Sequence, residues 1–268
     1  MAEPQQLKPV EALDKPVTMV AIVAHHDDIE FGTSGSIAKW IEEGAEVTYV
    51  IITDGSAGSN EPGINPKELA ETRKAEQLAA AKAVGVKDVR FLGYKDGTLA
   101  PTMELRKELT RILREIKPYR VIIQDPSTYF FGDGYINHPD HRAAGEAALY
   151  AVFPSSETRP IFSDLLDEGY EPHKVSELFM NITLNPTHFV DISGVWDKKK
   201  ASLKAHVSQL GADDDFENGA MKFITERNAE GGERVGVQYA EFFKVMTLVR
   251  ANEDVREQDM EVPENMAE

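Results

Sequence analysis

The sequence predicts an α/β protein with a mostly parallel sheet and helices on both faces. Four apolar, β-branched runs alternate with segments of helical periodicity along the first 152 residues, which is the pattern of repeated βαβ units. The runs at residues 17–24 and 46–53 are almost continuously apolar, as expected for strands that are covered on both faces. These observations together favour parallel strands joined by right-handed crossover helices.

Each element of this pattern can be placed along the chain. Strands are expected at residues 17–24, 46–53, 88–92 and 120–124, and helices at residues 37–43, 67–84, 103–116 and 139–152. Gly85 suits the C-cap of the second helix, and Pro139 suits the first turn of the last one. In the less regular second half we expect strands at residues 175–184, 188–192 and 239–249 and helices at residues 195–210 and 216–228.

The chain of 268 residues is long enough for one large α/β domain. We expect that single domain at residues 17–250. Residues 1–16 are polar and contain prolines, so we expect a flexible arm there. Residues 251–268 are strongly acidic, and we expect them to form a mobile tail.

Composition excludes several classes of function. The net charge of −17 and the pI near 4.9 argue against nucleic acid and anionic membranes as partners. The absence of cysteine excludes disulfides, thiolate zinc sites and cysteine nucleophiles. With no apolar leader or membrane-length run, we expect a cytoplasmic protein that acts on a small molecule. The oligomeric state stays open, with a homo-oligomer as one option.

Two short polar clusters each follow a predicted strand. His25, His26, Asp27 and Asp28 lie in a row after the first strand, and the run from His138 to His141 follows the fourth. Ligands of open α/β sheets bind beyond the carboxyl ends of the strands, and four of the seven histidines lie in these two clusters. We therefore predict one metal site at this edge of the sheet, built from both clusters.

The residue types leave the metal and some roles open. Two imidazoles and one carboxylate with free positions suit catalytic zinc, and the same ligands suit non-haem Fe(II). One of the adjacent carboxylates Asp27 and Asp28 can bind the metal while the other acts as a general base. Likewise, only one of His138 and His141 needs to be a ligand, and the other can stabilise an oxyanion. Asp140, between them, can orient a histidine.

These residues resemble the motifs of a known family. The stretch Ala24-His-x-Asp-Asp-x-Glu30 resembles the first motif of the PIG-L/LmbE-like zinc-dependent N-deacetylases, and His138-Pro-Asp-His141-Arg resembles their second motif. The resemblance covers roughly residues 17–210. Further matches are Thr53-Asp-Gly55, Arg73 with Glu76, Asp96-Gly97-x-Leu99, Asp191-Ile-Ser193, Lys200 and His206-x-Ser-Gln209.

The resemblance implies a Rossmann-like fold and a zinc hydrolase that removes N-acetyl groups, commonly from N-acetylglucosamine units. In this interpretation zinc activates water and polarises the amide carbonyl. The implied metal ligands are His25, Asp28 and His141. The other implied roles are Asp27 as general base, His138 as oxyanion stabiliser or proton donor, and Arg73 and Asp96 as substrate contacts.

The chain departs from the family pattern at two positions. His26 stands where the family usually has proline, and Ile136 stands where a tyrosine often lies, with Tyr135 one residue earlier. The resemblance therefore assigns no catalytic role to a tyrosine of this chain.

Three other functions compete with the deacetylase. A non-haem Fe(II) oxygenase can use the same His/Asp/His ligands, but its usual scaffold is a β-barrel, whereas this chain alternates strands and helices. A metal-stabilised, non-catalytic binding domain gives Asp27 and His138 no role. A dinucleotide-binding domain needs a glycine-rich turn after the first strand, and that turn is His-His-Asp-Asp here.

Overall fold

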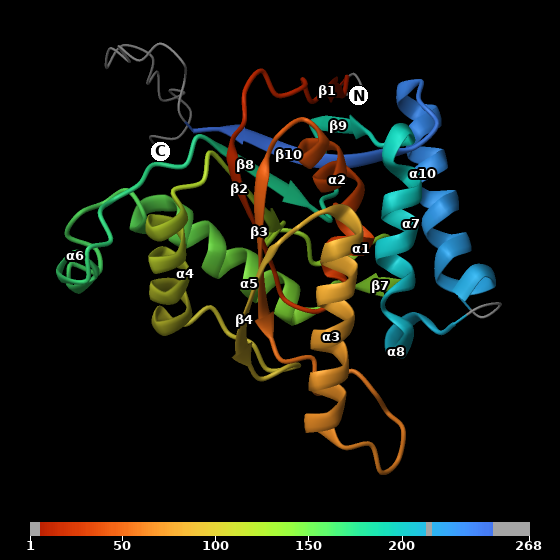
Figure 1. Ribbon diagram of the computed structural model, residues 1–268, viewed down its shortest axis with the longest axis horizontal. Coiled ribbons are helices and arrows are strands. Elements are labelled where there is room, and N and C mark those ends of the chain that lie inside the picture. Colours follow the sequence, from red (N-terminus) through yellow and green to blue (C-terminus); the bar gives the residue numbers. More distant parts are fainter. Residues whose placement is uncertain (1–5, 213–215, 249–268) are drawn as a thin grey trace, which may run out of the picture.

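An eight-stranded sheet runs through the centre of the computed structural model, which describes residues 6–212 and 216–248. The sheet has the strand order β1-β9-β10-β8-β5-β2-β3-β4, and helices lie on both of its sides (Figure 1). The predicted acidic tail at residues 251–268 lies outside the described residues. Among the described helices, none is long and apolar enough to cross a lipid bilayer.

The sheet is mostly parallel, which confirms the predicted fold class. Strand β10 pairs antiparallel with β8 and β9, and the other described pairs of the large sheet are parallel. Strands β2 and β5 are buried along nearly their whole length, as expected inside a sheet with two covered faces. The strands are β1 Lys8–Pro9, β2 Thr18–Val23, β3 Glu46–Thr53, β4 Asp88–Tyr94, β5 Arg120–Gln124, β8 Glu177–Asn181, β9 His188–Asp191 and β10 Ala240–Thr247.

Two hydrophobic cores lie on the two faces of the sheet. Helices α4 and α5 cover one face, and α1, α2, α3 and α7 lie on the other (Figure 1). Alternate residues of β2 point to opposite cores: Ala21 packs with Trp40, whereas Ile22 packs with Leu109. The α-helices are α1 Asp28–Gly32, α2 Ser34–Glu42, α3 Pro66–Val84, α4 Met103–Ile116, α5 Pro139–Tyr150, α6 Asp164–Asp167, α7 Trp196–Lys204, α8 Val207–Leu210 and α10 Lys222–Val235; other helical turns are Ala151–Ser155, Ser193–Val195 and Glu217–Met221.

Local capping chemistry sets several helix boundaries. The side chain of Asn65 accepts from the backbone N–H of Lys67 at the start of α3, and Gly85 closes that helix in the left-handed conformation with φ 97°. Thr102 caps α4 in the same way through the N–H of Leu105. Because these signals are local, the predicted helices at residues 67–84 and 103–116 agree with the structure.

The expected helix at residues 195–210 is wrong as a single element. It divides into α7 and α8, and His206 between them has φ −87° and ψ 57°. The break allows the His206 side chain, which is fully buried, to reach the carboxylate of Glu30 at 3.1 Å. A buried polar contact therefore overrides the helical periodicity at this point.

Three other segments differ from expectation, and in the first of them two distant parts of the chain pair. Within residues 1–16, expected to be a flexible arm, Lys8–Pro9 forms β1 and pairs with β9. The backbone N–H of Leu13 also donates to Glu43. The loop at residues 125–137 contains a small hairpin, with β6 Phe130–Phe131 and β7 Tyr135–Ile136. The helix expected at residues 216–228 continues to Val235.

Helix α5 approaches the sheet closely at Gly145. A Cβ atom there would lie 2.2 Å from the backbone oxygen of Gln124 in β5. We expect Gly145→Ala to destabilise the protein by about 1–3 kcal/mol, the usual cost of overpacking. Although alanine favours helices, the clash is with backbone, which cannot move aside easily. Thermal unfolding measures the effect. Gly219→Ala, with no atom within 4 Å of its new Cβ, is the control; equal melting temperatures for both variants would contradict the prediction.

Candidate active site

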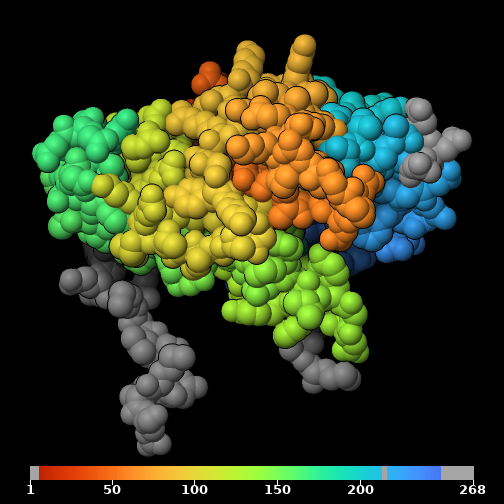
Figure 2. All heavy atoms as spheres, turned by 90° about the horizontal axis from the view of Figure 1, so that it is seen from below, coloured from red at the N-terminus to blue at the C-terminus, as the bar shows by residue number. Residues whose placement is uncertain are grey.

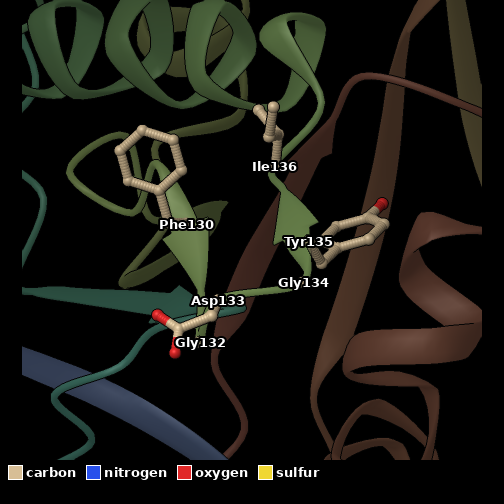
Figure 3. A pocket seen from close by; sticks show the side chains of 6 residues that line it. All are labelled: Phe130, Gly132, Asp133, Gly134, Tyr135 and Ile136. Carbon is tan, nitrogen blue, oxygen red and sulfur yellow. The ribbon is translucent and has the colours of Figure 1, made fainter.

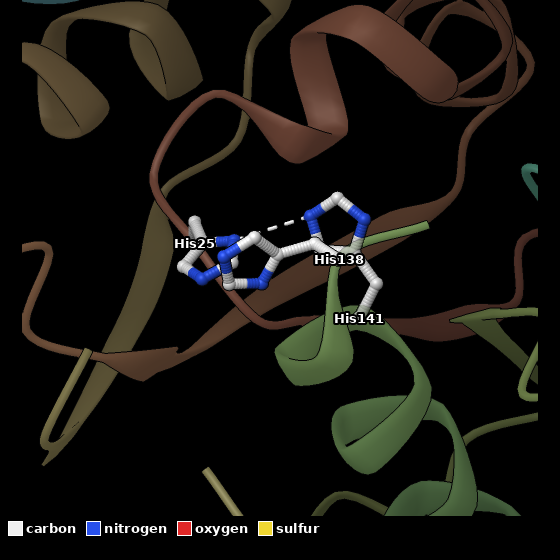
Figure 4. Close-up of side chains that lie close together, drawn as sticks. All are labelled: His25, His138 and His141. Carbon is white, nitrogen blue, oxygen red and sulfur yellow. Dashed lines mark hydrogen bonds between the residues drawn. The ribbon is translucent and has the colours of Figure 1, made fainter. Parts of the chain in front are cut away.

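The two polar clusters meet at the carboxyl edge of the sheet. His25 follows β2, whereas His138 and His141 lie at the start of α5, and their three rings face one another (Figure 4). Two groups of side chains with potential metal-ligating atoms are present among the described residues, His25–His138–His141 and His25–Asp96–Asp140. Both groups contain His25, so this residue lies at the centre of the cluster.

Donor atoms of His25, Asp28 and His141 form a small triangle, the donor triangle, to which Asp28 contributes both carboxylate oxygens. The Nε2 atom of His141 lies 3.2 Å from Nδ1 of His25, the contact dashed in Figure 4, and 3.0 Å from Oδ1 of Asp28. Nδ1 of His25 lies 3.5 Å from Oδ2 of Asp28. Tetrahedral zinc ligands at about 2.0–2.1 Å from the ion lie about 3.3 Å from each other. The spacing and the chemistry of these donors therefore fit zinc with an open fourth position.

The other nitrogen of His25 faces two carboxylates. Its Nε2 lies 3.2 Å from Oδ1 of Asp96 and 3.3 Å from Oδ2 of Asp140. Asp140 is 1% exposed and also accepts from the backbone N–H groups of Gly97 and Leu99, at 2.8 and 3.1 Å. Because the carboxylates hold the Nε2 edge, the Nδ1 atom is turned into the donor triangle. Carboxylates that orient a ligating histidine in this way are common in metal sites.

The electrostatics of the cluster favour a cation. Burial opposes protonation of His25. The carboxylates of Asp140, Asp28 and Asp96, which accept hydrogen bonds from the protonated ring, outweigh this effect of burial and raise the pKa of His25 to about 12. For Asp28, burial would raise the pKa, yet His141 and His25 hold the pKa of this carboxyl well below its usual range. A set of carboxylates this tightly packed therefore stabilises positive charge at its centre.

Asp27 lines the same cleft without belonging to the donor triangle. Its backbone has φ 88° and ψ −23°, a left-handed conformation that costs a residue other than glycine about 1–3 kcal/mol and is concentrated at functional sites. Burial, and then the adjacent Asp28 carboxylate, raise the pKa of Asp27 to about 8. Asp27 is thus a carboxyl group that can exchange a proton near neutral pH.

His138 presents one defined nitrogen to the cleft. Its Nδ1 accepts from the backbone N–H of Asp140 at 3.2 Å, which caps helix α5. A neutral ring therefore carries its hydrogen on Nε2. Burial, followed by the charge of His25, lowers the pKa of His138, which favours this neutral, hydrogen-donating form. The ring centroids of His138 and His25 are 4.7 Å apart.

Arg73 lies at the wall of the cleft but is held by the protein itself. Its guanidinium donates to the backbone oxygens of Gly55 and Gly58 at 3.0 and 2.9 Å, and it lies 4.0 Å from Asp96. At 6% exposure, most of its hydrogen-bonding capacity holds the loop that follows β3. Arg73 therefore has a structural role in this loop, and its contact with substrate stays a prediction.

The cleft has a volume of about 1040 Å³, and much of its wall comes from residues that sequence reasoning missed. The missed residues are Phe223 and Arg227 of helix α10 and Phe242 of β10; the wall also includes Phe131 and Tyr135 of the β6–β7 hairpin. Phe223 and Arg227 are four residues apart in a predicted helix, so their shared face could be inferred. That this face lines the cleft could not, because it depends on packing between distant segments.

The β6–β7 hairpin exposes several apolar side chains. Phe130 is 60% exposed and Tyr135 is 58% exposed, and the residues around the turn enclose a separate hollow of about 490 Å³ (Figure 3). Figure 2 shows this light-green segment projecting beside the orange loop that precedes α3. Tyr135 belongs to both the hollow and the main cleft, so the hairpin forms one edge of the site.

A buried lysine next to the expected motif position was also missed. Lys199 is fully buried and donates to Oε1 of Glu241 at 2.6 Å and to the backbone oxygen of Glu30 at 2.8 Å. Lys200, which the family resemblance singled out, instead pairs with Asp197 on the surface. The buried polar contacts of this segment therefore lie one residue before the position that the resemblance indicates.

Comparison with known proteins agrees with the motifs. The sequence model of the PIG-L family, described as GlcNAc-PI de-N-acetylase, matches residues 20–152. A diacetylchitobiose deacetylase from Thermococcus kodakarensis is 35% identical over 199 residues, which covers 73% of this chain and 71% of the relative. The chain belongs to the PIG-L/LmbE-like deacetylase family.

Solved structures show that this family fold extends beyond the matched motifs. The N,N'-diacetylchitobiose deacetylase of Pyrococcus horikoshii is 33% identical, superposes with a TM-score of 0.78 and covers 87% of this chain and 84% of its own. A 4-carboxy-2-hydroxymuconate hydratase from Pseudomonas putida, 21% identical, covers 90% of this chain and 100% of its own with a TM-score of 0.70. Since a PIG-L-like fold also occurs in a hydratase, the fold alone does not decide the reaction.

We expect Asp140→Asn to weaken zinc binding by about 10- to 100-fold, the usual effect of losing a carboxylate that orients a ligating histidine. The amide keeps the size of the side chain but removes the charge beside His25. Competition with a chromophoric chelator measures the affinity. Asp125→Asn is the matched control, because Asp125 is equally buried and bonds Ser127 and Thr183 rather than His25. Equal zinc affinities for the two variants would show that Asp140 does not act on the metal site.

Proposed function

We propose that the protein is a zinc-dependent amidohydrolase that removes the N-acetyl group from an N-acetylglucosamine-type sugar or glycoside. The observation that carries this proposal is the donor triangle of His25, Asp28 and His141, flanked by Asp27 and His138, two acid–base groups outside it. Relatives support the substrate class by name: one is the diacetylchitobiose deacetylase, and another, from Bacillus anthracis, is a probable N-acetyl-alpha-D-glucosaminyl L-malate deacetylase 2.

In this proposal Nδ1 of His25, the Asp28 carboxylate and Nε2 of His141 hold the zinc ion. When bound, zinc supplies Lewis acidity, which lowers the pKa of a water molecule and polarises a carbonyl group. Asp140 and Asp96 keep the His25 ring turned toward the ion through its Nε2 edge. On the other ligand, Oδ1 of Asn137 lies 3.1 Å from Nδ1 of His141 and holds that ring in the same manner.

Asp27 and His138 divide the proton transfers of amide hydrolysis. The Asp27 carboxylate accepts a proton from the attacking water as the oxygen of that water bonds to the amide carbon. The Nε2–H group of His138 stabilises the carbonyl oxygen as it gains negative charge, or supplies the proton that the nitrogen needs when the C–N bond breaks. Acetate and a free amine are the products.

The walls of the cleft suit a sugar. Asp27, Asp28 and Asp96 line the cleft together with the cations of Arg73 and Arg227, so polar groups of both signs face a bound ligand. Phe131 and Tyr135 offer aromatic faces at the hairpin edge, against which the apolar face of a sugar ring can stack. The strongly negative charge of the whole chain also disfavours nucleic acid as a substrate or partner.

Release of a free amine from N-acetylated sugars tests the proposed function. We expect zinc-loaded protein to release amine and an equal amount of acetate from N-acetylglucosamine or N,N'-diacetylchitobiose, and to lose this activity with a chelator. Iron-dependent oxygen uptake without amine release would instead identify an Fe(II) oxygenase. Stoichiometric metal binding without turnover of any acetylated glycoside would identify a binding domain.

Asp27→Asn should lower kcat by about 10²–10⁴-fold, the usual contribution of a general base. The amide keeps the size of the side chain but cannot accept the proton, so KM and a zinc content of about one ion per chain should persist. Steady-state kinetics and elemental analysis measure these quantities. His141→Ala is the comparison variant, which should lose both zinc and activity. If Asp27→Asn loses its zinc, then Asp27 rather than Asp28 is the ligand.

A further inference from the structure

The backbone of Asp27 is in an unusual conformation that needs support. Its φ of 88° lies in the left-handed region, which residues other than glycine adopt only where their surroundings hold them. The direction of a side chain follows from its backbone, so whatever holds the peptide at Asp27 also aims its carboxylate into the cleft. The backbone oxygen of Asp27 accepts only the ordinary first helical bond from the N–H of Phe31, at 3.0 Å.

Gln77 holds the amide side of this peptide. It lies in α3, is fully buried, and its Oε1 accepts from the backbone N–H of Asp27 at 3.1 Å. Its Nε2 donates to both carboxylate oxygens of Glu30, each at 3.2 Å. Since an ionised carboxylate can only accept, Glu30 forces the amino end of Gln77 toward itself and the carbonyl end toward Asp27.

Gln209 holds the carbonyl side of the same peptide. Its Nε2 donates to the backbone oxygen of His26 at 3.3 Å and lies 3.4 Å from Nδ1 of His206. Nε2 of His206 in turn lies 3.1 Å from the Glu30 carboxylate. The oxygen of His26 and the N–H of Asp27 belong to one peptide bond. Side chains from three separate segments therefore close a ring around a single peptide plane.

We propose that this ring, the peptide clamp of Gln77, Glu30, His206 and Gln209, positions Asp27 for its work as general base. The proposal rests on the proposed deacetylase function. Within the described part of the chain, the hydrogen bonds of the clamp go to the peptide and to one another rather than to the zinc donors. Gln77, Glu30 and His206 are therefore positioning residues that act through Asp27, and Gln209, which also lines the cleft, completes the ring.

The clamp also explains the break between α7 and α8. His206 has φ −87° and ψ 57°, which is not a helical conformation. In a continuous helix its side chain would point in another direction. The break instead places its ring, which is fully buried, between Glu30 and Gln209. Glu76 supports the same junction, because its carboxylate accepts from both the N–H and the hydroxyl of Ser208, at 2.7 and 2.6 Å.

A double-mutant cycle tests the clamp. We expect Gln77→Leu to lower kcat by about 10- to 100-fold, the range expected when a catalytic group is misplaced by less than a bond length, with KM and zinc content unchanged. In the Asp27→Asn background the same change should have little further effect, because the group it positions no longer accepts a proton. A purely structural role would instead cost the same factor in both backgrounds.

Gln124→Leu is the matched control. Gln124 is also buried, and its Oε1 accepts from the backbone N–H of Ala24 at 3.0 Å, so the control removes a similar hydrogen bond close to the same turn. Whatever its effect on the melting temperature, any effect of this control on kcat should be equal with and without Asp27→Asn.

Exchange of two clamp residues provides a rescue. Gln77→Glu alone places two carboxylates side by side, and we expect it to lower kcat as Gln77→Leu does. In the double variant Gln77→Glu/Glu30→Gln every donor again meets an acceptor: position 77 accepts from Asp27 and from the new amide, which in turn accepts from His206. Most of the lost kcat should return. If Gln77→Leu does not fold, Gln209→Leu, at the half-buried end of the clamp, is the second variant for the same double-mutant cycle.

The outcomes separate the clamp from the function on which it rests. If the unmodified protein releases no amine from any acetylated sugar, the proposed function is wrong. If the unmodified protein is active and Asp27→Asn is impaired, yet Gln77→Leu costs the same factor in both backgrounds, then the clamp proposal is overturned while the function stands. Loss of zinc in Gln77→Leu would also overturn it, because the clamp would then support the metal site instead.

Discussion

The bond between Asp140 and His25 is the contact on which the site depends. Asp140 lies in the first turn of helix α5, and His25 follows β2. Asp140 also accepts hydrogen bonds from the backbone N–H groups of Gly97 and Leu99, which follow β4. One buried carboxylate thus ties together three loops that leave the carboxyl edge of the sheet. Asp140 meets Nε2 of His25 at 3.3 Å from its anchored, buried position, so this contact fixes the His25 ring and holds the two polar clusters beside each other.

The close packing of α5 on the sheet makes that contact possible. Gly145 lets the helix approach the backbone of Gln124 at the end of β5, and this approach sets the depth at which the first turn of α5 meets β2. The geometry of the site therefore depends on Gly145, which has no side chain and takes no part in the reaction. In the same way, the aim of Asp27 depends on buried groups in α3, α1 and the α7–α8 junction.

The two halves of the chain contribute different parts of the cleft. The donor triangle, Asp27 and His138 all lie within residues 20–152, the part that the family model matches. Residues after that part supply much of the wall, including Phe223, Arg227 and Phe242, as well as two members of the peptide clamp. Such a division leaves the chemistry constant while the surrounding wall can change the substrate.

The sequence by itself determined the α/β class, the parallel strands of the first half and the two clusters that meet at the candidate metal site. These features follow from local periodicity: β3 and helix α4 occupy the predicted residues because their apolar spacing and caps lie within each segment. Only the tertiary structure decided the short strand β1, the break at His206, the burial of Lys199 rather than Lys200, and the shared peptide of Gln77 and Gln209. Each of these depends on a polar or strand-pairing partner far along the chain, and the local pattern of a segment holds no information about such a partner.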